Sequence, residues 1–372
     1  MLSAILLPRR TSDMPQRLPA LARPALTALL VLAVSACAPD EPAADLAITD
    51  VAVVDAVNGL REGQTVVVDD GVIVSVQPAG ETPPAVEVVD GSGRYLIPGL
   101  WDFHVHLSYD ERFTDAMPAL FLRHGITSIR DTGGLVENVQ PVVERMEAEG
   151  ATAPRVFWAG PLLDGAFVVY DGENRPPLGI ANPDPETAQE NVARLAEAGV
   201  DFLKVYEMVT PEVFDALVSA AQERGLPVDG HVPLSMTADQ AGPRMTSMEH
   251  LRNVELACAT DADELLAARR SILANPDGVP GADLRSRLHN EQRLPAVAAY
   301  DEARCDQVLA ALQNTIQVPT LRLNALGIQA PWERDDWEEA LARLPADAQE
   351  AWRSETLDQG EAPARDTTFG AW

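Results

Sequence analysis

The stretch that decides the fold is residues 97–106, which read IPGLWDFHVH: an apolar run that ends in two histidines one residue apart. It marks a change of pattern along the chain. Before it, short β-branched runs follow one another closely; after it, apolar strand-like runs alternate with stretches of helical periodicity. Buried strands separated by helices are typical of parallel β/α units. In a barrel of such units the chemistry lies at the carboxyl ends of the strands.

Working outward from this stretch, we predict an α/β fold: an incomplete (β/α)8 TIM-type barrel over residues 96–372. Helices are expected near 111–124, 186–198 and 211–224. The predicted barrel strands are 100–106, 125–131, 155–160, 201–206, 227–231, 246–250 and 315–321. We find no eighth strand in the remaining sequence.

Upstream, residues 45–95 predict the first part of a small β-sandwich domain. Runs rich in valine and isoleucine lie at 47–54, 64–68, 72–76 and 86–89. The turn Asp69-Asp70-Gly71 lies between two of them, and Asp-Gly between β-branched runs is a strong hairpin signal.

Residues 1–36 are interpreted as an export signal rather than part of the fold. Four arginines precede the short apolar run 25–33, and small residues then lead to Cys37. Such a run is too short for a stable membrane span. Because small residues ending at a cysteine resemble a bacterial lipoprotein cleavage box, we expect Cys37 to be lipidated. Residues 37–44 would then be a tether to the outer membrane, facing the periplasm; ordinary secretion is the alternative.

Charge and cysteine content limit the partners and the compartment. The chain has 57 acidic and 28 basic residues, a net charge of −29, which argues against nucleic acid as a partner. Disulfides persist outside the cytoplasm. Apart from Cys37 the chain has only Cys258 and Cys305, which we predict to be bridged.

One basic residue stands apart: the chain has a single lysine, Lys204, beside 27 arginines. Unlike a guanidinium, a buried lysine amine can lose its proton. It can then form a Schiff base, or capture carbon dioxide as a carbamate whose oxygens bind metals. The alternative is a lysine that survives by chance at a strand end.

Four of the six histidines fall at predicted strand ends: His104, His106, His231 and His250. The alternation of side chains along a strand puts the first two on one face, where both can bind a metal. The remaining two, His124 and His289, are interpreted as ordinary surface or cap residues.

On these motifs, residues 45–321 resemble the amidohydrolase superfamily, in the branch of imidazolonepropionase-like enzymes and metal-dependent prolidases. The matching stretches are 97–106, 125–134, 202–206, 230–233 and 248–250. The resemblance implies two divalent metal ions held by these histidines and bridged by Lys204 as a carbamate. His104 and His106 would hold the buried ion, and His231 and His250 the more exposed one. Nitrogen and oxygen ligands suit zinc.

The implied activity is hydrolysis of a carbon–nitrogen bond in a small molecule: a non-peptide amide, a cyclic amide or a dipeptide. Metal ions of this kind polarise a carbonyl and acidify water. Tyr206 is a candidate donor to the substrate, or a core tyrosine. Arg130 is expected to pair with a neighbouring acid such as Asp131; contact with an anionic group of the substrate is the alternative. Alternatives are a mononuclear deaminase or an ester or phosphotriester hydrolase of the same superfamily, or a non-catalytic metal-binding envelope lipoprotein. The oligomeric state stays open.

The sequence departs from the superfamily pattern at the end of the barrel. Members of the superfamily place an aspartate after the eighth strand, usually within Gly-Thr-Asp, as a metal ligand and general base. No such motif follows residue 321. The expectation is therefore a C-terminally truncated chain that folds poorly, because an open barrel leaves two strand edges unpaired, and that has impaired activity.

Overall fold

A computed structural model of the chain describes residues 43–173, 175–275, 277–321 and 331–358. The chain divides into two compact units, Met1–Ile97 and Pro98–Trp372, which are treated separately below. The predicted signal peptide and Cys37 lie outside the described residues.

The first unit holds one sheet with the strand order β3-β2-β1-β4, and β5 pairs with β1. β1 pairs antiparallel with β2 and parallel with β4 and β5. The hairpin predicted at Asp70-Gly71 is present: both residues have positive φ, as a tight turn between β2 and β3 requires. The second layer of the predicted sandwich stays a prediction. The strands are β1 (Ala44–Asp55), β2 (Gly59–Asp69), β3 (Val72–Pro78), β4 (Ala85–Asp90) and β5 (Tyr95–Leu96).

In the second unit every paired strand runs parallel to its neighbours, in a three-stranded sheet β6-β7-β8 and a six-stranded sheet β10-β9-β11-β12-β13-β14. The third predicted barrel strand is present as β8, which pairs with β7, and a further strand that was not predicted, β9, follows it and pairs with β11. The path from β6 to β14 therefore follows the order of the predicted strands, which confirms the parallel β/α organisation. The strands are β6 (Leu100–Val105), β7 (Ile126–Asp131), β8 (Arg155–Trp158), β9 (Leu162–Asp164), β10 (Gly179–Ala181), β11 (Leu203–Val205), β12 (Val228–Gly230), β13 (Ser247–Glu249) and β14 (Ile316–Val318).

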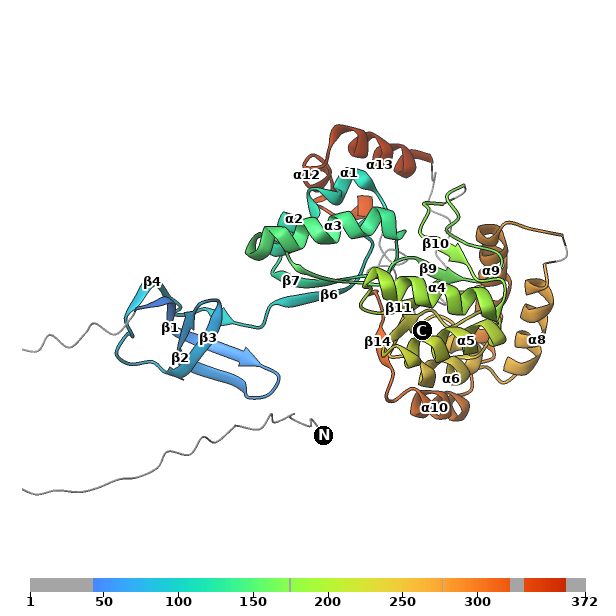
Figure 1. Ribbon diagram of the computed structural model, residues 1–372, viewed down its shortest axis with the longest axis horizontal. Helices are drawn as coiled ribbons and strands as arrows, with labels where there is room; N and C mark the ends of the chain where they lie inside the picture. The colour runs from blue at the N-terminus through green and yellow to red at the C-terminus, as the bar shows by residue number, and fades with distance from the viewer. Residues whose placement is uncertain (1–42, 174, 276, 322–330, 359–372) are drawn as a thin grey trace, which may run out of the picture. The chain divides into compact units, whose positions relative to one another are not determined.

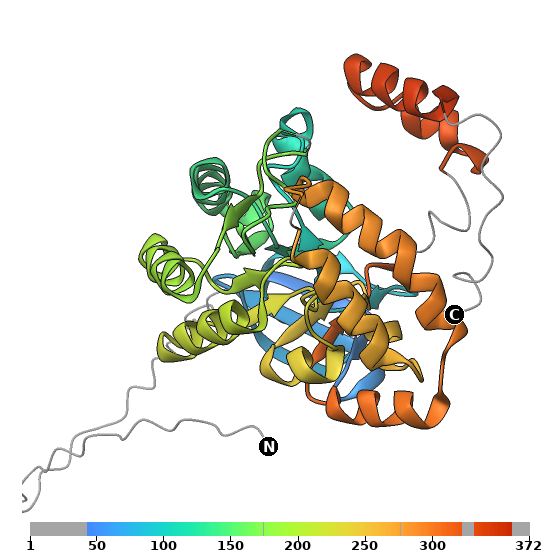
Figure 2. The same ribbon diagram turned by 90° about the vertical axis from the view of Figure 1, so that its right-hand side faces the viewer.

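Helices connect these strands and lie outside them, as the views in Figures 1 and 2 show. The α-helices are α1 (Glu111–Thr114), α2 (Met117–Arg123), α3 (Val136–Glu149), α4 (Pro185–Ala198), α5 (Pro211–Glu223), α6 (Ala238–Ala241), α7 (Val254–Ala257), α8 (Ala262–Leu273), α9 (Gly281–Ala298), α10 (Glu302–Ala311), α12 (Trp337–Leu341) and α13 (Ala346–Asp358). Short 3-10 turns are η1 (Gly150–Thr152), η2 (Gly242–Arg244) and η3 (Pro331–Glu333).

The best predicted helices have clear end signals in the sequence. In α4 the Asp184 side chain accepts a hydrogen bond from the Thr187 N–H, a proline opens the helix, and Gly199 ends it with φ of 81°. In α5 the Thr210 hydroxyl accepts from the Val213 N–H. The expected absence of an eighth barrel strand stays a prediction, because residues 322–330 and 359–372 lie outside the described ranges.

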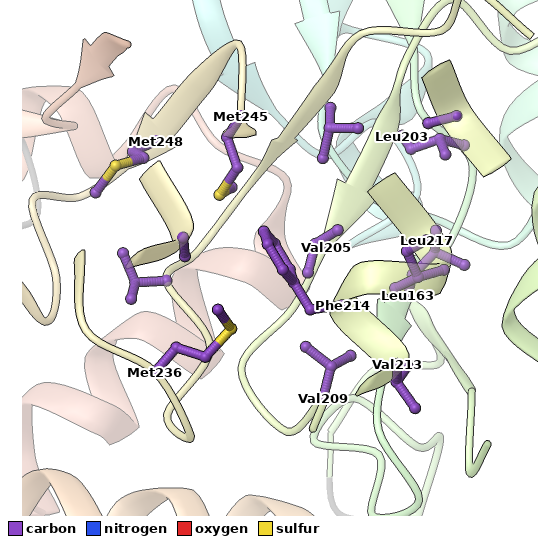
Figure 3. Close-up of a cluster of buried hydrophobic side chains, with 14 of the residues drawn as sticks. Leu163, Leu203, Val205, Val209, Val213, Phe214, Leu217, Met236, Met245 and Met248 are labelled. Atoms are coloured by element: carbon purple, nitrogen blue, oxygen red, sulfur yellow. The ribbon is translucent and has the colours of Figure 1, made fainter. Parts of the chain in front are cut away.

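Alternate side chains of β11 face the core of the second unit and its pocket. Leu203 and Val205 belong to a buried apolar cluster with Val213, Phe214 and Leu217 of α5 (Figure 3). Successive side chains of a strand point to opposite faces. Lys204, between the two apolar residues, therefore points away from α5 and lines the pocket described below.

A disulfide joins the segment after β13 to the helix before β14: Cys258 caps α7 and Cys305 lies in α10. Mass spectrometry of non-reduced peptides tests the bridge in the purified protein. Over the described residues, none of the helices combines the length and the apolar character that a bilayer crossing needs.

Candidate active site

The carboxyl ends of β6, β11, β12 and β13 deliver the predicted site residues into one pocket with a volume of about 370 Å³. This is where a parallel barrel is expected to place its chemistry. The structure brings together all six side chains assigned to the metal site and the substrate: His104, His106, Lys204, Tyr206, His231 and His250.

The four imidazoles form a continuous group. Ring centroids are 5.1 Å apart for His104 and His106, 4.5 Å for His104 and His250, and 4.8 Å for His231 and His250. Burial lowers the pKa of His104 and His106 to about 3 and that of His231 to about 4, and it also lowers the pKa of His250. All four rings are therefore neutral near pH 7, the form that binds a metal.

Hydrogen bonds orient three of these rings through Nδ1. His104 Nδ1 is 2.7 Å from Glu249 Oε2, His106 Nδ1 is 2.8 Å from the Gly133 carbonyl, and His231 Nδ1 is 2.5 Å from Glu207 Oε1. An N–H donated from Nδ1 to an oxygen leaves Nε2 as the free lone pair, the arrangement typical of metal-binding histidines.

His250 differs from the other three histidines. Within the described residues its Nδ1 atom is buried without a hydrogen-bond partner. Its backbone has φ of 61°, a conformation that non-glycine residues adopt at a cost of roughly 1–3 kcal/mol. A buried acceptor without a partner and a strained backbone at the end of β13 both fit a residue positioned to bind a ligand.

A donor set for one metal ion is already assembled. His104, Glu249 and His250 offer ligand atoms that all lie within 4.8 Å of one another. Two imidazoles and a carboxylate are ligands that divalent zinc accepts. These residues therefore fit a divalent metal ion.

Lys204 is buried between two carboxylates. Its Nζ lies 3.1 Å from Asp229 Oδ2 and 3.3 Å from Glu249 Oε1. Because Glu249 also contacts His104, a single carboxylate links the lysine to the first imidazole. Lys204 therefore lines the same pocket as the four imidazoles, at the carboxyl ends of the strands, as its place on β11 predicts.

Arg130 forms the expected ion pair with an acid, but the partner is Asp229 and not Asp131. Arg130 lies 3.0 Å from Asp229 and packs over the Phe202 ring at 4.4 Å. Asp131 points the other way along the alternating strand β7 and accepts the backbone N–H groups of Leu107 and Gly133, at 2.6 and 3.1 Å. It thereby fixes the segment that follows His106. Burial raises the pKa of Asp131 to about 6.

Tyr206 lies at the pocket with 4% of its surface exposed, and its ring centroid is 4.6 Å from that of His231. Burial, and then the charge of Glu207, raises the pKa of its hydroxyl above the usual value. Tyr206 is therefore a neutral O–H donor near the imidazoles.

Sequence reasoning missed the carboxylate that organises one side of the site. Glu207 is fully buried and is contacted by His231, by Arg252 at 3.3 Å, by Arg285 at 2.9 Å and by His289 at 2.8 Å. Burial alone would raise its pKa, but Arg285, His289 and the His231 hydrogen bond hold the pKa well below its usual value.

His289 is thus not an ordinary surface residue, because α9 brings its ring onto Glu207. His124 does cap a helix, α2, as interpreted. The place of Glu207, directly after Tyr206 at a strand end, was a usable signal. Nothing in the sequence of α9 predicts its contact with this carboxylate.

Comparison with known proteins gives curated relatives that are named adenine deaminase and dihydroorotase. No family model matches the chain. It is 27% identical over 249 residues to an adenine deaminase of Listeria innocua serovar 6a, which covers 66% of this chain and 41% of the relative. It is 29% identical over 124 residues to a dihydroorotase of Trichlorobacter lovleyi, covering 30% of this chain and 28% of the relative. The chain therefore spans less than half of the length of these curated relatives.

Solved structures agree on the fold. A bottromycin amidohydrolase superposes with a TM-score of 0.56 at 23% identity, covering 87% of this chain and 63% of the other. Ochratoxinase of A. niger superposes with a TM-score of 0.50 at 17% identity, covering 83% of this chain and 84% of the other. The chain therefore shares its fold with these two proteins, as the resemblance drawn from the sequence motifs predicts.

Proposed function

We propose that this chain is a metal-dependent hydrolase that cleaves a carbon–nitrogen bond in a small amide, cyclic amide or dipeptide. Two divalent ions, with zinc favoured, would be held by His104, His106, His231 and His250 and bridged by carbamylated Lys204. The observation that carries the proposal is the convergence of four neutral imidazoles and the single lysine in one pocket.

When bound, such ions supply Lewis-acid polarisation of the substrate carbonyl and lower the pKa of water. The residues of the chain supply position and protons. Glu249, the Gly133 carbonyl and Glu207 fix the rings of His104, His106 and His231. Tyr206 donates its O–H to the substrate carbonyl oxygen, where negative charge develops during attack.

The surroundings of Lys204 make its modification depend on metal. Carbamate formation joins the lysine nitrogen to carbon dioxide and releases one proton to solvent, so a cation becomes an anion. Asp229 and Glu249, at 3.1 and 3.3 Å from the lysine nitrogen, would repel the carbamate anion. The carbamate is therefore expected only when divalent cations offset three neighbouring negative charges.

Substitution of the lysine tests the proposal. Metal analysis of the purified full chain and of Lys204→Arg is the measurement, together with hydrolysis of an amide and dipeptide panel. We expect about two ions per chain and turnover for the unaltered protein, and at most one ion without turnover for the variant. Two ions per chain and retained activity in Lys204→Arg would refute the bridging role.

A second candidate is a mononuclear hydrolase or deaminase. It is favoured by the assembled set of His104, Glu249 and His250, which needs no modified lysine, and by the deaminase relatives. In this case Lys204 stays unmodified and keeps its contact with Asp229. One ion per chain, unchanged by Lys204→Arg and lost in Glu249→Gln, would select this candidate.

Membrane attachment is a separate part of the proposal. We propose that Cys37 is acylated and anchors the chain in the bacterial envelope, as the basic and apolar residues before it indicate. Labelling with a radioactive fatty acid should mark the chain in bacteria, and Cys37→Ser should lose both the label and membrane fractionation. A labelled Cys37→Ser protein contradicts the anchor.

A further inference from the structure

A second cavity lies within the second unit, at the opposite ends of the strands from the candidate active-site pocket. This amino-end cavity has a volume of about 240 Å³. Its lining comes from the starts of the strands: Trp101 is the second residue of β6, Ile316 is the first residue of β14, and Phe202 directly precedes β11. Among the described residues, none lines both this cavity and the pocket that holds the four imidazoles.

Three aromatic rings form one wall of the amino-end cavity. The Trp101 ring stacks on Phe103, with centroids 5.4 Å apart and planes at 25°, and on Phe157, with centroids 5.2 Å apart and planes at 27°. Trp101 keeps 42% of its surface exposed, and Phe103 keeps 40%. The interior of a parallel barrel is usually filled by packed, branched side chains. A stacked and half-exposed aromatic wall at this place is therefore a surface onto which a flat ring can pack.

An ion-paired layer lies between the amino-end cavity and the active-site pocket. The Arg130 guanidinium packs over the rings of Phe103 and Phe202, at 5.5 and 4.4 Å from their centroids. It lies 3.0 Å from Asp229 Oδ2, the oxygen that also contacts Lys204 at 3.1 Å. Arg130 and Asp229 line the cavity, whereas Lys204 lines the pocket. The two spaces are therefore separate sites.

The charges of the lining favour an uncharged ligand. The Arg130 charge is already paired with Asp229, so it offers little free attraction to an anion, and it repels a cation. Asp201 adds a carboxylate whose Oδ2 accepts the Trp158 N–H, and this negative charge also disfavours an anion. A charged ligand without a free counter-charge in an aromatic cavity would lose its hydration at a large cost. Asp201 and Thr246 remain as polar groups to which a hydroxyl can hydrogen-bond.

We propose that the amino-end cavity is a binding site for an uncharged, planar aromatic molecule of two fused rings. An apolar cavity of roughly 150 Å³ holds benzene, so a volume of about 240 Å³ can hold a bicyclic ring system. The rings pack on Trp101 and Phe157, and a polar substituent faces Asp201 or Thr246. The site goes beyond the proposed hydrolase activity and needs no metal ion.

Calorimetry with 2-naphthol tests the site on the chelator-treated full chain. This ligand has two fused aromatic rings and a hydroxyl that stays neutral near pH 7, because phenols titrate near about pH 10. Decahydro-2-naphthol has the same skeleton without the aromatic rings. We expect 2-naphthol to bind about three- to tenfold more tightly, since stacked rings contribute beyond the area that they bury. Equal affinities, or no saturable binding of 2-naphthol, overturn the proposal.

Substitutions assign the binding to the aromatic wall. Trp101→Leu should weaken 2-naphthol binding about tenfold, because it removes the ring that contacts both neighbours in the stack. The matched control is Trp352→Leu, since Trp352 is 38% exposed and stacks on Trp337 outside the cavity. This control should leave the affinity unchanged.

A second variant covers the case in which Trp101→Leu does not fold. Ile316 is 56% exposed, so Ile316→Trp can fill the cavity from the start of β14 without disturbing the buried core. It should reduce the affinity for 2-naphthol by about tenfold or more. Binding that survives in Ile316→Trp overturns the proposal.

Two further outcomes would place the ligand or the cavity elsewhere. Binding that is lost in Tyr170→Leu but kept in Trp101→Leu puts the rings in the active-site pocket, which Tyr170 lines, and rejects the amino-end site. Sedimentation that finds a dimer of the full chain and a monomer of Ile316→Trp makes the cavity an interface between two copies, and this also rejects it.

Discussion

Two buried glutamates flank the candidate metal site, and their surroundings differ. Glu249 contacts one imidazole, His104, and one amine, Lys204. Glu207 contacts His231 together with Arg252, Arg285 and His289. Glu249 has few partners and belongs to a compact donor set that fits a metal ion. Glu207 is saturated by cationic and imidazole groups and serves as a structural anchor.

The difference shows how one pocket can hold a carboxylate that stabilises the fold beside another that can bind a metal ion. A buried anion that is fully paired holds several elements together, and removing it is costly. A buried anion beside neutral imidazoles retains capacity for a metal. Glu207 lies two residues after β11 and Glu249 is the last residue of β13, so both lie at strand ends. Their different roles come from their different partners.

The largest expected effect is on folding, from Glu207→Gln. Removing the charge leaves Arg252 and Arg285 without their shared anion, and we expect a loss of roughly 3–5 kcal/mol in the free energy of unfolding. Urea unfolding is the measurement. The control is Glu291→Gln, an exposed residue paired with Arg287, where the change should be under about 1 kcal/mol. A loss at Glu207 no larger than at Glu291 would remove the anchor role.

A third buried carboxylate, Asp164, extends the comparison because it should make the free energy of unfolding depend on pH. Asp164 accepts the backbone N–H groups of Gly165, Val169 and Met208 and has no cationic partner among the described residues. Burial raises its pKa from 3.8 to about 7.

Because the folded state of Asp164 binds its proton more tightly than the unfolded state, its contribution to stability is present at low pH. That contribution is lost as pH rises from about 4 to about 7, at up to roughly 1.4 kcal/mol per pH unit. Thermal melts across this range should show a decline that is weaker in Asp164→Asn. An equal decline in both proteins contradicts the assignment.

Glu249→Gln should have the smallest effect on folding. Its effect on metal binding should be clear. Lys204 keeps Asp229 as a partner, so the free energy of unfolding should change less than in Glu207→Gln. Metal affinity should fall roughly 10- to 100-fold, the usual result when a partner of a ligating histidine is lost. Titration with zinc and a competing chelator measures this. Unchanged affinity would show that Glu249 has no part in the metal site.

Much of the second unit was predictable from the sequence, for a local reason. Apolar strand runs, Gly199 after a periodic stretch and the proline at the start of α4 are signals carried by neighbouring residues. The same holds for His104, His106, His231 and His250, because strand ends meet at one edge of a parallel barrel.

What the sequence could not predict depends on contacts between distant segments. Arg285 and Glu207 are 78 residues apart, and the segment between β13 and β14 that carries α9 has no sequence signal for where it packs. The partner of Arg130 was wrong for a similar reason: alternation along β7 turns Asp131 away, and the neighbouring strand β12 supplies Asp229. The short strand β9, which follows β8 and pairs with β11, was likewise not predicted.

The most direct test of the central claim is an anomalous scattering map at the zinc edge, from crystals of the full chain grown with zinc and bicarbonate. Our account predicts two peaks among the four imidazoles, joined by density that extends from Lys204 Nζ as a carbamate. A single peak between His104, Glu249 and His250 beside an unmodified Lys204, or no peak in the pocket, would contradict it.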